Sequence, residues 1–310
     1  MKRITLTIGI PAYNEQENIS SLLDSISAQK QKSYKVEKII IVADGCTDST
    51  EDIIKKRMKS NKLINLMVGA KREGKAKALN IIYKNSQSDL LLTIDADLIF
   101  VGNNSIEEMV KTIKRNPKTN LVGPRHVPVR PKSLMGKFAY VSYLSFEDAF
   151  LKLNNGNNFY AMMATGLIRK DFYKTFTYPE GTISDQCYLY VSATRNNKYG
   201  FKLSKNAHVM FRTVSTFEDW RILGVRSVIM DKENVAGYFG RDILSEFSIP
   251  KKLFFTSLLK WLIKSPIYTT GSILMNIYIR KFPKRELMPK NGMWELAKSS
   301  KKNIRLTKTI

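Results

Sequence analysis

Two aspartates one residue apart, Asp95 and Asp97, follow an apolar run that begins at Leu90, and together they could hold a divalent cation. Side chains two positions apart on a strand point the same way, so both carboxylates can converge on one ion where the strand ends. Mg²⁺ or Mn²⁺ suits oxygen ligands and is usually held by one or two carboxylates plus substrate phosphates. The alternative is that one aspartate caps the next helix and the other is solvated.

Other polar residues stand where predicted strands meet predicted helices. Pro11 is expected to end the first strand, and Glu15 lies near the start of a helix, whose free N–H groups suit a diphosphate. Asp44 ends the second strand and could accept a hydrogen bond from an imide or a ribose hydroxyl. Lys75, at a third junction, suits a phosphate. Each could equally be a cap, a turn residue or part of a solvated helix start.

The pattern of apolar residues predicts strands alternating with helices through the first half of the chain. Such alternation favours an α/β fold with a mainly parallel, Rossmann-like sheet covered by helices on both faces. Ligands then bind at the carboxyl ends of the strands, where the residues above fall. The expected strands are 4–10, 38–45, 64–70 and 90–100, and the expected helices are 14–29, 48–60, 74–86 and 105–116.

The second half is less regular. We expect a strand and a proline-rich loop over 120–131, a helix over 133–153, and a strand, a turn at Gly166 and a helix start over 159–173. Residues 201–213 alternate as a strand, and the chain becomes helical and basic from about residue 216. This pattern predicts a catalytic domain over 1–230 and a helical, basic extension over 231–310.

The net charge of +24 in 310 residues indicates attraction to a polyanion, such as nucleic acid, an acidic membrane or a phosphorylated ligand. The composition is globular, with 43% hydrophobic residues. Two cysteines in unrelated contexts suit a reducing compartment. The sequence shows neither a signal peptide nor an apolar run long enough for a transmembrane helix.

The segments IPAYNEQENI, DGCTDST, GKAKALN and DADL, in this order and spacing, resemble the inverting family 2 glycosyltransferases. The resemblance covers roughly the first 230 residues and implies the A-type glycosyltransferase fold. It also implies a nucleotide-sugar donor (a UDP-sugar or GDP-sugar), a divalent cation, and attack by an acceptor hydroxyl on the anomeric carbon. The matching nucleotide-contact positions are Pro11, Tyr13, Glu15 and Asp44, and the metal–diphosphate motif is Asp95 and Asp97.

The resemblance further implies an acidic general base, for which Asp185 is the candidate, in a Ser-Asp pair where Glu-Asp is usual. Arg226 matches the arginine of the family's Q-x-x-R-W element, but Leu223 and Ser227 replace its glutamine and tryptophan, which argues against processive synthesis. Arg125 resembles an arginine of the lipid-phosphate hexose transferases, and His208 could complete a metal shell. The alternative for Asp185 is a helix cap, and the alternative for His208 is a structural role. Arg226 and Arg125 could instead be surface arginines.

Residues 251–284 mix aromatic and aliphatic side chains with lysines, which suits an interfacial helix on an anionic membrane. The alternative is a helix that packs on the catalytic domain. We therefore expect sugar transfer to a hydroxyl or phosphate of a lipid-linked or glycan acceptor at the cytoplasmic face of the membrane. The two alternative functions are a nucleotidyltransferase on the same fold and a polyanion-binding module. The acidic residues at the strand ends argue against the polyanion-binding module and against a nucleic-acid partner.

Overall fold

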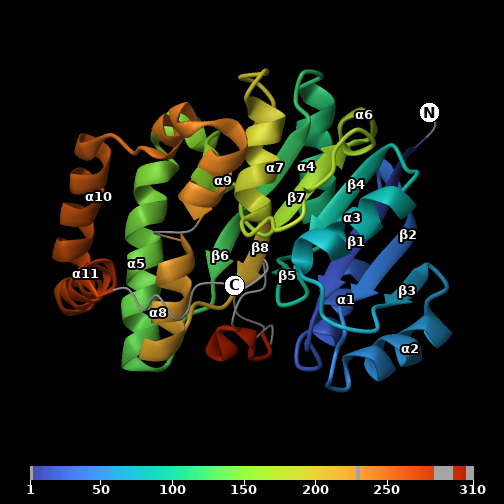
Figure 1. Cartoon of the computed structure of the whole chain (residues 1–310), viewed down its shortest axis with the longest axis horizontal. Helices are drawn as coiled ribbons and strands as arrows, with labels where there is room; N and C mark the ends of the chain where they lie inside the picture. The colour runs from blue at the N-terminus through green and yellow to red at the C-terminus, as the bar shows by residue number, and fades with distance from the viewer. Residues whose placement is uncertain (1–2, 228–230, 283–295, 305–310) are drawn as a thin grey trace.

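One mixed sheet forms the centre of the molecule (Figure 1). The computed structural model describes residues 3–227, 231–282 and 296–304. Within these residues the sheet has eight strands in the order β3-β2-β1-β4-β7-β6-β8-β5. Helices cover both of its faces, which confirms the predicted α/β fold.

The first half of the chain builds a parallel sheet. β1 pairs in parallel with β2 and β4, and β2 pairs with β3. The strands are β1 (Ile4–Ala12), β2 (Tyr34–Ala43), β3 (Ile64–Val68) and β4 (Leu90–Ile94). The helices are α1 (Ile19–Ser27), α2 (Thr50–Ser60), α3 (Lys75–Asn85) and α4 (Ser105–Arg115).

Both faces of this sheet are buried, which explains the continuous apolar runs. Ile39 and Ile41 of β2 belong to a core that also contains residues of α1, α2 and α4. Ile40 and Val42 point to the other face, where they join a core with α3 and the helices of the second half.

The second half adds antiparallel strands. β7 (Thr165–Arg169) pairs antiparallel with β4 and with β6 (Leu121–Pro128). β6 is parallel to β8 (Phe201–Phe211), and the short β5 (Ile99–Phe100) pairs antiparallel with β8. The helices of this half are α5 (Leu134–Phe150), α6 (Lys170–Tyr173) and α7 (Asp185–Thr194), with 3₁₀ turns at Leu153–Gly156 and Phe159–Ala161.

Three local predictions are wrong. Pro11 does not end β1, which continues to Ala12; the pairing of β1 with β4 ends at Gly9, so the missing N–H of Pro11 removes no bond there. Gly166 is not in a turn but within β7, where an added Cβ would lie 3.0 Å from Leu121 Cδ1. The expected strand 90–100 is divided into β4 and β5, which lie at different places in the sheet, and the two aspartates fall in the turn between them.

The C-terminal region is helical, as predicted. Val235 and Phe247 join the core beside α7, while α10 and α11 pack on α5 (Figure 1). None of the described helices combines the length and hydropathy that crossing a bilayer requires. The elements are α8 (Phe217–Val225), α9 (Asp231–Phe239), a 3₁₀ helix at Arg241–Phe247, α10 (Lys251–Lys264), α11 (Pro266–Lys281) and a 3₁₀ helix, η6, at Lys298–Lys301.

The segment 251–284 is therefore two helices rather than one. Ser265 separates them, and Pro266 occupies the first turn of α11, where a proline removes no helical hydrogen bond. Residues 283 and 284 of this segment lie outside the described residues, as does most of the region between α11 and η6.

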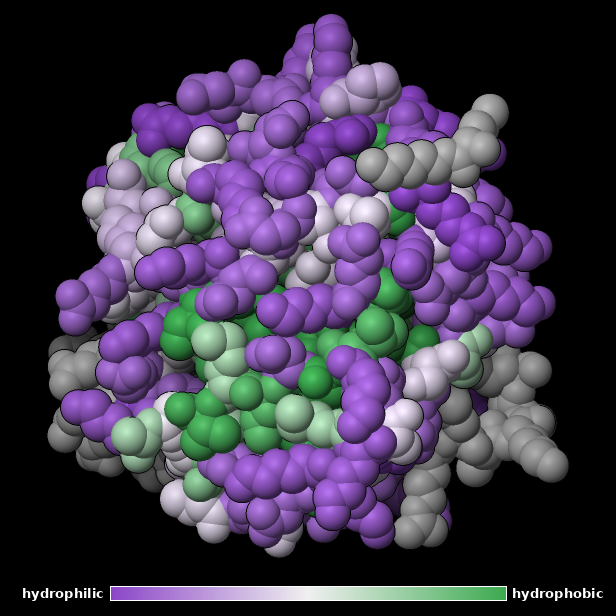
Figure 2. Space-filling view, turned by 90° about the vertical axis from the view of Figure 1, so that its right-hand side faces the viewer, coloured by the Kyte–Doolittle hydropathy of each residue, from purple (hydrophilic) through white to green (hydrophobic). Residues whose placement is uncertain are grey.

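The opposite side of the molecule carries the free edge of the sheet. Figure 2 views this side and shows apolar side chains gathered within a polar rim, over the edge where β3 lies. Leu63 and Val68 are exposed apolar residues of this edge.

Candidate active site

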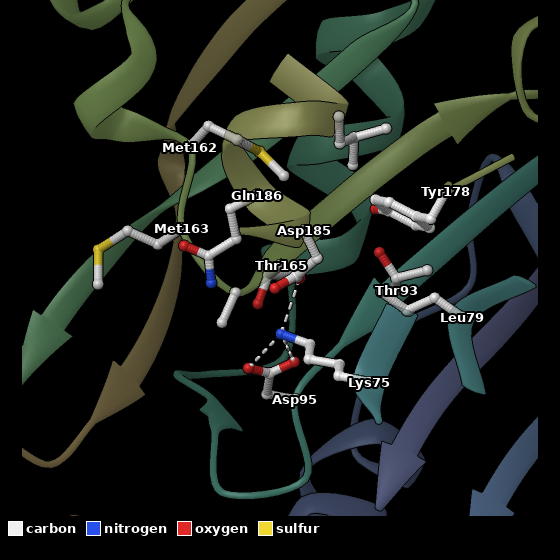
Figure 3. Close-up of a pocket in the computed structure, with 12 residues that line it drawn as sticks. Lys75, Leu79, Thr93, Asp95, Met162, Met163, Thr165, Tyr178, Asp185 and Gln186 are labelled. Carbon is white, nitrogen blue, oxygen red and sulfur yellow. Dashed lines mark hydrogen bonds and ion pairs between the residues drawn. The ribbon is translucent and has the colours of Figure 1, made fainter. Parts of the chain in front are cut away.

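A pocket with about 250 Å³ of empty space, part of it open to solvent, lies where β4 ends and where α3 and α7 begin (Figure 3). Lys75 is the first residue of α3, Asp95 directly follows β4, and Asp185 is the first residue of α7. β7 runs antiparallel to β4, so its first residue, Thr165, lies opposite Ile94 at the same end of the sheet as Asp95. Three candidates from distant parts of the sequence thus line one cavity.

The ammonium group of Lys75 joins the two carboxylates. Its Nζ lies 2.7 and 2.8 Å from the two oxygens of Asp95, and 2.9 Å from Oδ2 of Asp185. The second oxygen of Asp185 lies 4.0 Å from Arg226 Nη2. The side chain of Asp185 is only 9% exposed, so its charge depends on these two cations.

Burial dominates the electrostatics of this cluster. It raises the pKa of Asp95 to about 6, and the charges of Asp185 and Asp97 also raise it, against the lowering effect of Lys75. Burial alone would lower the pKa of Lys75, but the carboxylates of Asp185 and Asp95 outweigh it and raise that pKa above its usual value. The lysine is therefore held as an ammonium ion.

Asp95 and Asp97 fit a hard cation that a substrate also ligates. The charge of Asp97 acts on both Asp95 and Glu15, which places it beside the buried cluster. Among the described residues no group of three or more histidine, cysteine or acidic side chains could hold a metal. Two carboxylates suffice for Mg²⁺ or Mn²⁺ only where phosphates and waters supply the remaining oxygens.

Glu15 is paired with a residue that the sequence did not suggest. Its carboxylate forms an ion pair with Lys301 of η6 and accepts a 3.0 Å hydrogen bond from Asn18 Nδ2. Asn18 Nδ2 also donates to the carbonyl of Lys301 at 2.6 Å, so the C-terminal segment lies against α1 (Figure 1). Burial and the charge of Asp97 raise the pKa of Glu15 to about 7, although Lys301 lowers it.

We expect Lys301→Met to lower the free energy of unfolding by about 1–3 kcal/mol, because it leaves a buried carboxylate without its cation. The combined change Glu15→Gln and Lys301→Met should recover most of the loss, since it removes both charges. Urea denaturation of the two variants measures this difference. Equal losses in the single and double variants would contradict a stabilising pair.

The other predicted nucleotide contacts lie at or near the ends of β1 and β2. Arg72 lies over the ring of Tyr13, 4.2 Å from its centroid. Asp44 is buried, and its two oxygens accept 2.8 Å hydrogen bonds from the backbone N–H groups of Glu73 and Gly74. Asp44 therefore fixes the loop that carries Lys75, in addition to any contact with a base or ribose. Pro11 lies within β1, paired with Val42.

Arg125 and His208 lie apart from the carboxylates. Arg125 donates to both oxygens of Glu147, at 3.0 and 3.1 Å, and lines a second pocket that shares only Met163 with the first. His208 hydrogen-bonds through its backbone to Ser105 at the start of α4. Burial and the charge of Arg125 lower the pKa of His208. The structure does not gather His208 with the two aspartates.

Three residues of the site were missed. Thr165 and Gln186 line the same pocket as Asp185. Gln186 directly follows the predicted base in the sequence, whereas Thr165 comes to the pocket through the pairing of β7 with β4. Lys301 gives no signal, because 286 positions separate it from Glu15.

The helix-covered mixed sheet agrees with the A-type glycosyltransferase fold. Residues 7–176, more than half of the chain, match the family model "Glycosyl transferase family 2". The chain belongs to this family and is a glycosyltransferase, which confirms the resemblance of its four motifs.

Curated relatives match somewhat less than half of the chain. Poly-beta-1,6-N-acetyl-D-glucosamine synthase of Staphylococcus aureus (strain COL) is 34% identical over 143 residues, which are 45% of this chain and 33% of that protein. The synthase of Staphylococcus epidermidis is 32% identical over 141 residues, 44% of this chain and 32% of that protein. The matched region thus spans about a third of the length of these relatives.

Solved structures share the fold over most of the chain. S. aureus TarS in complex with UDP-GlcNAc has a TM-score of 0.52 and 17% identity, and the match covers 90% of this chain and 88% of that one. The mannosyltransferase PcManGT from Pyrobaculum calidifontis, in complex with GDP-Man and Mn²⁺, has a TM-score of 0.57 and 16% identity, covering 90% and 86%. At this identity the likeness shows the fold alone.

Proposed function

We propose that the protein transfers a sugar, with inversion and with a divalent cation, from a UDP-sugar or GDP-sugar to an acceptor hydroxyl. One observation carries the proposal: a single ammonium group, Lys75 Nζ, contacts both Asp95 and Asp185. The carboxylate of the metal–diphosphate motif and that of the candidate base therefore lie within one pocket. In a direct sugar transfer, the leaving diphosphate and the attacking hydroxyl both lie at the anomeric carbon, so the groups that act on them must share one pocket.

The chain's own residues have separate parts in this transfer. Asp185 accepts the proton of the acceptor hydroxyl as its oxygen forms a bond with the anomeric carbon. The bond from that carbon to the diphosphate breaks on the opposite side, and the electron pair leaves with the diphosphate. Arg226 and Lys75 both contact Asp185, and their positive charges would stabilise the negative charge of the leaving diphosphate. A divalent ion held by Asp95 and Asp97 would stabilise the same charge.

The test of the reaction is release of nucleoside diphosphate from a panel of UDP-sugars and GDP-sugars with Mn²⁺, with and without a lipid extract. Release of the nucleoside diphosphate, and greater release with the extract, is expected. Release of pyrophosphate instead would favour a nucleotidyltransferase.

We also propose that residues 231–310 form an extension that places the catalytic domain, residues 1–230, on an anionic membrane at its cytoplasmic face. On α10, Phe255, Leu259 and Ile263 are 60%, 60% and 78% exposed. Their spacing of four places them on one side of the helix. Ile267 and Leu274 of α11 are also exposed, at 74% and 62%. Lysines of α10, with the charge of +24, complement acidic headgroups.

We expect the whole protein to float with liposomes that contain anionic lipid, and the variant Leu259→Ser, Ile263→Ser to float much less. Each basic residue near the surface contributes roughly 1 kcal/mol, so binding should weaken as salt rises. The matched control is Leu63→Ser, Val68→Ser, which removes two exposed apolar residues at the β3 edge. Equal flotation of both variants would place the membrane contact elsewhere.

A further inference from the structure

Two polar side chains in the pocket have no part in the chemistry above. Thr165 is 1% exposed, and its hydroxyl has no hydrogen-bond partner in the described residues. The side chain of Gln186 likewise makes no hydrogen bond within the described part of the chain. Both line the same pocket as Asp185.

These two groups offer complementary hydrogen bonds to a ligand. A glutamine amide supplies two donors and one acceptor, and a hydroxyl can donate or accept. Figure 3 shows the amide of Gln186 directed into the cavity, on the Met163 side of Asp185. A buried hydroxyl without a partner is costly, so a ligand that pairs with Thr165 gains affinity.

The same pocket has an apolar wall. Met162, Met163 and Leu189 are among the residues that line it. Methionine side chains adapt to small apolar groups, such as a methyl group. The group that lies beside the reacting hydroxyl must therefore be polar at two points and apolar at a third.

An acylamino substituent has this chemistry. In a planar trans amide the N–H and the C=O point in opposite directions, so they need partners on different elements. Gln186 on α7 and Thr165 on β7 are such a pair, and the methionines would receive the acyl methyl group. A single hydroxyl could pair with both side chains, but it has no apolar part for the methionines to receive.

We propose that Gln186 and Thr165 form an acceptor subsite that recognises an acylamino group next to the attacking hydroxyl. The acceptor would thus be an N-acylated amino sugar. This inference rests on the proposed function, because it places the acceptor hydroxyl at Asp185.

The test compares two acceptor probes, the methyl glycosides of N-acetylglucosamine and of glucose, which differ in this substituent. NMR titration of the whole protein without donor gives the ratio of their affinities. We expect the wild type to prefer the acetamido sugar. Gln186→Met removes the amide and keeps the length, and Thr165→Val removes the hydroxyl and keeps the shape. Each should lower the ratio roughly tenfold, because one hydrogen bond is lost and its partner is left unpaired.

The matched control is Thr194→Val, at the end of α7, whose hydroxyl donates to the carbonyl of Tyr190. It should keep the wild-type ratio, and melting temperatures report whether each variant folds. Equal affinities in the wild type, or an unchanged ratio in both pocket variants, would overturn the subsite. Because the titration needs no turnover, failure of the sugar-transfer assay would count against the proposed function alone.

Discussion

Asp185→Asn should lower turnover by ~10²–10⁴-fold while folding and donor binding survive. The amide is nearly isosteric with the carboxylate but cannot take the proton of an acceptor hydroxyl. Lys75 keeps its two contacts with Asp95, so the pocket retains its main ion pair. Single-turnover transfer measures the chemical step, and a titration with nucleoside diphosphate measures the affinity for the donor side.

The control for this experiment is Asp171→Asn, an exposed acid on α6 that should behave as the wild type. A variant of Asp185 with unchanged turnover would remove it from the chemistry. If the affinity for nucleoside diphosphate falls together with turnover, Asp185 instead orders the donor site through Lys75.

The sequence predicted the parts of the site that local pattern determines. Asp95, Lys75 and Asp185 each follow a strand or begin a helix, and the carboxyl ends of strands in such a sheet lie together. The apolar runs of β1, β2 and β4 were equally clear, because strands buried on both faces admit few polar residues.

Long-range packing determined the rest. The residue type of Gly166 predicts a turn, yet Gly166 lies in β7, where an added Cβ would be 3.0 Å from Leu121 Cδ1 and 3.1 Å from Met162 Cε, so that these neighbours would have to shift. Lys301 reaches Glu15 across 286 positions, and no periodicity encodes that contact. The aspartates were placed on a strand, but β5 leaves β4 to pair with β8, which turns the chain at Ala96.

The turn gives Asp97 a distinct position from Asp95. Lys75 already occupies both oxygens of Asp95, whereas no ion pair of Asp97 is found within the described residues. We therefore expect a divalent ion to bind mainly through Asp97, with the donor's phosphates as further ligands.

Asp97→Ala should abolish transfer and remove most of the metal-dependent binding of nucleotide, because one remaining carboxylate fixes the ion poorly. Folding should change little, because Asp97 repels the carboxylates of Asp95 and Glu15 while it attracts Lys301, so that its removal has opposing effects. The measurements are transfer with and without Mn²⁺, nucleotide titration at both conditions, and the melting temperature. Asp52→Ala, which removes an exposed acid of α2, is the matched control. Full activity of the wild type in EDTA, or Mn²⁺-dependent binding that survives in Asp97→Ala, would show that the cation is held elsewhere or is not needed.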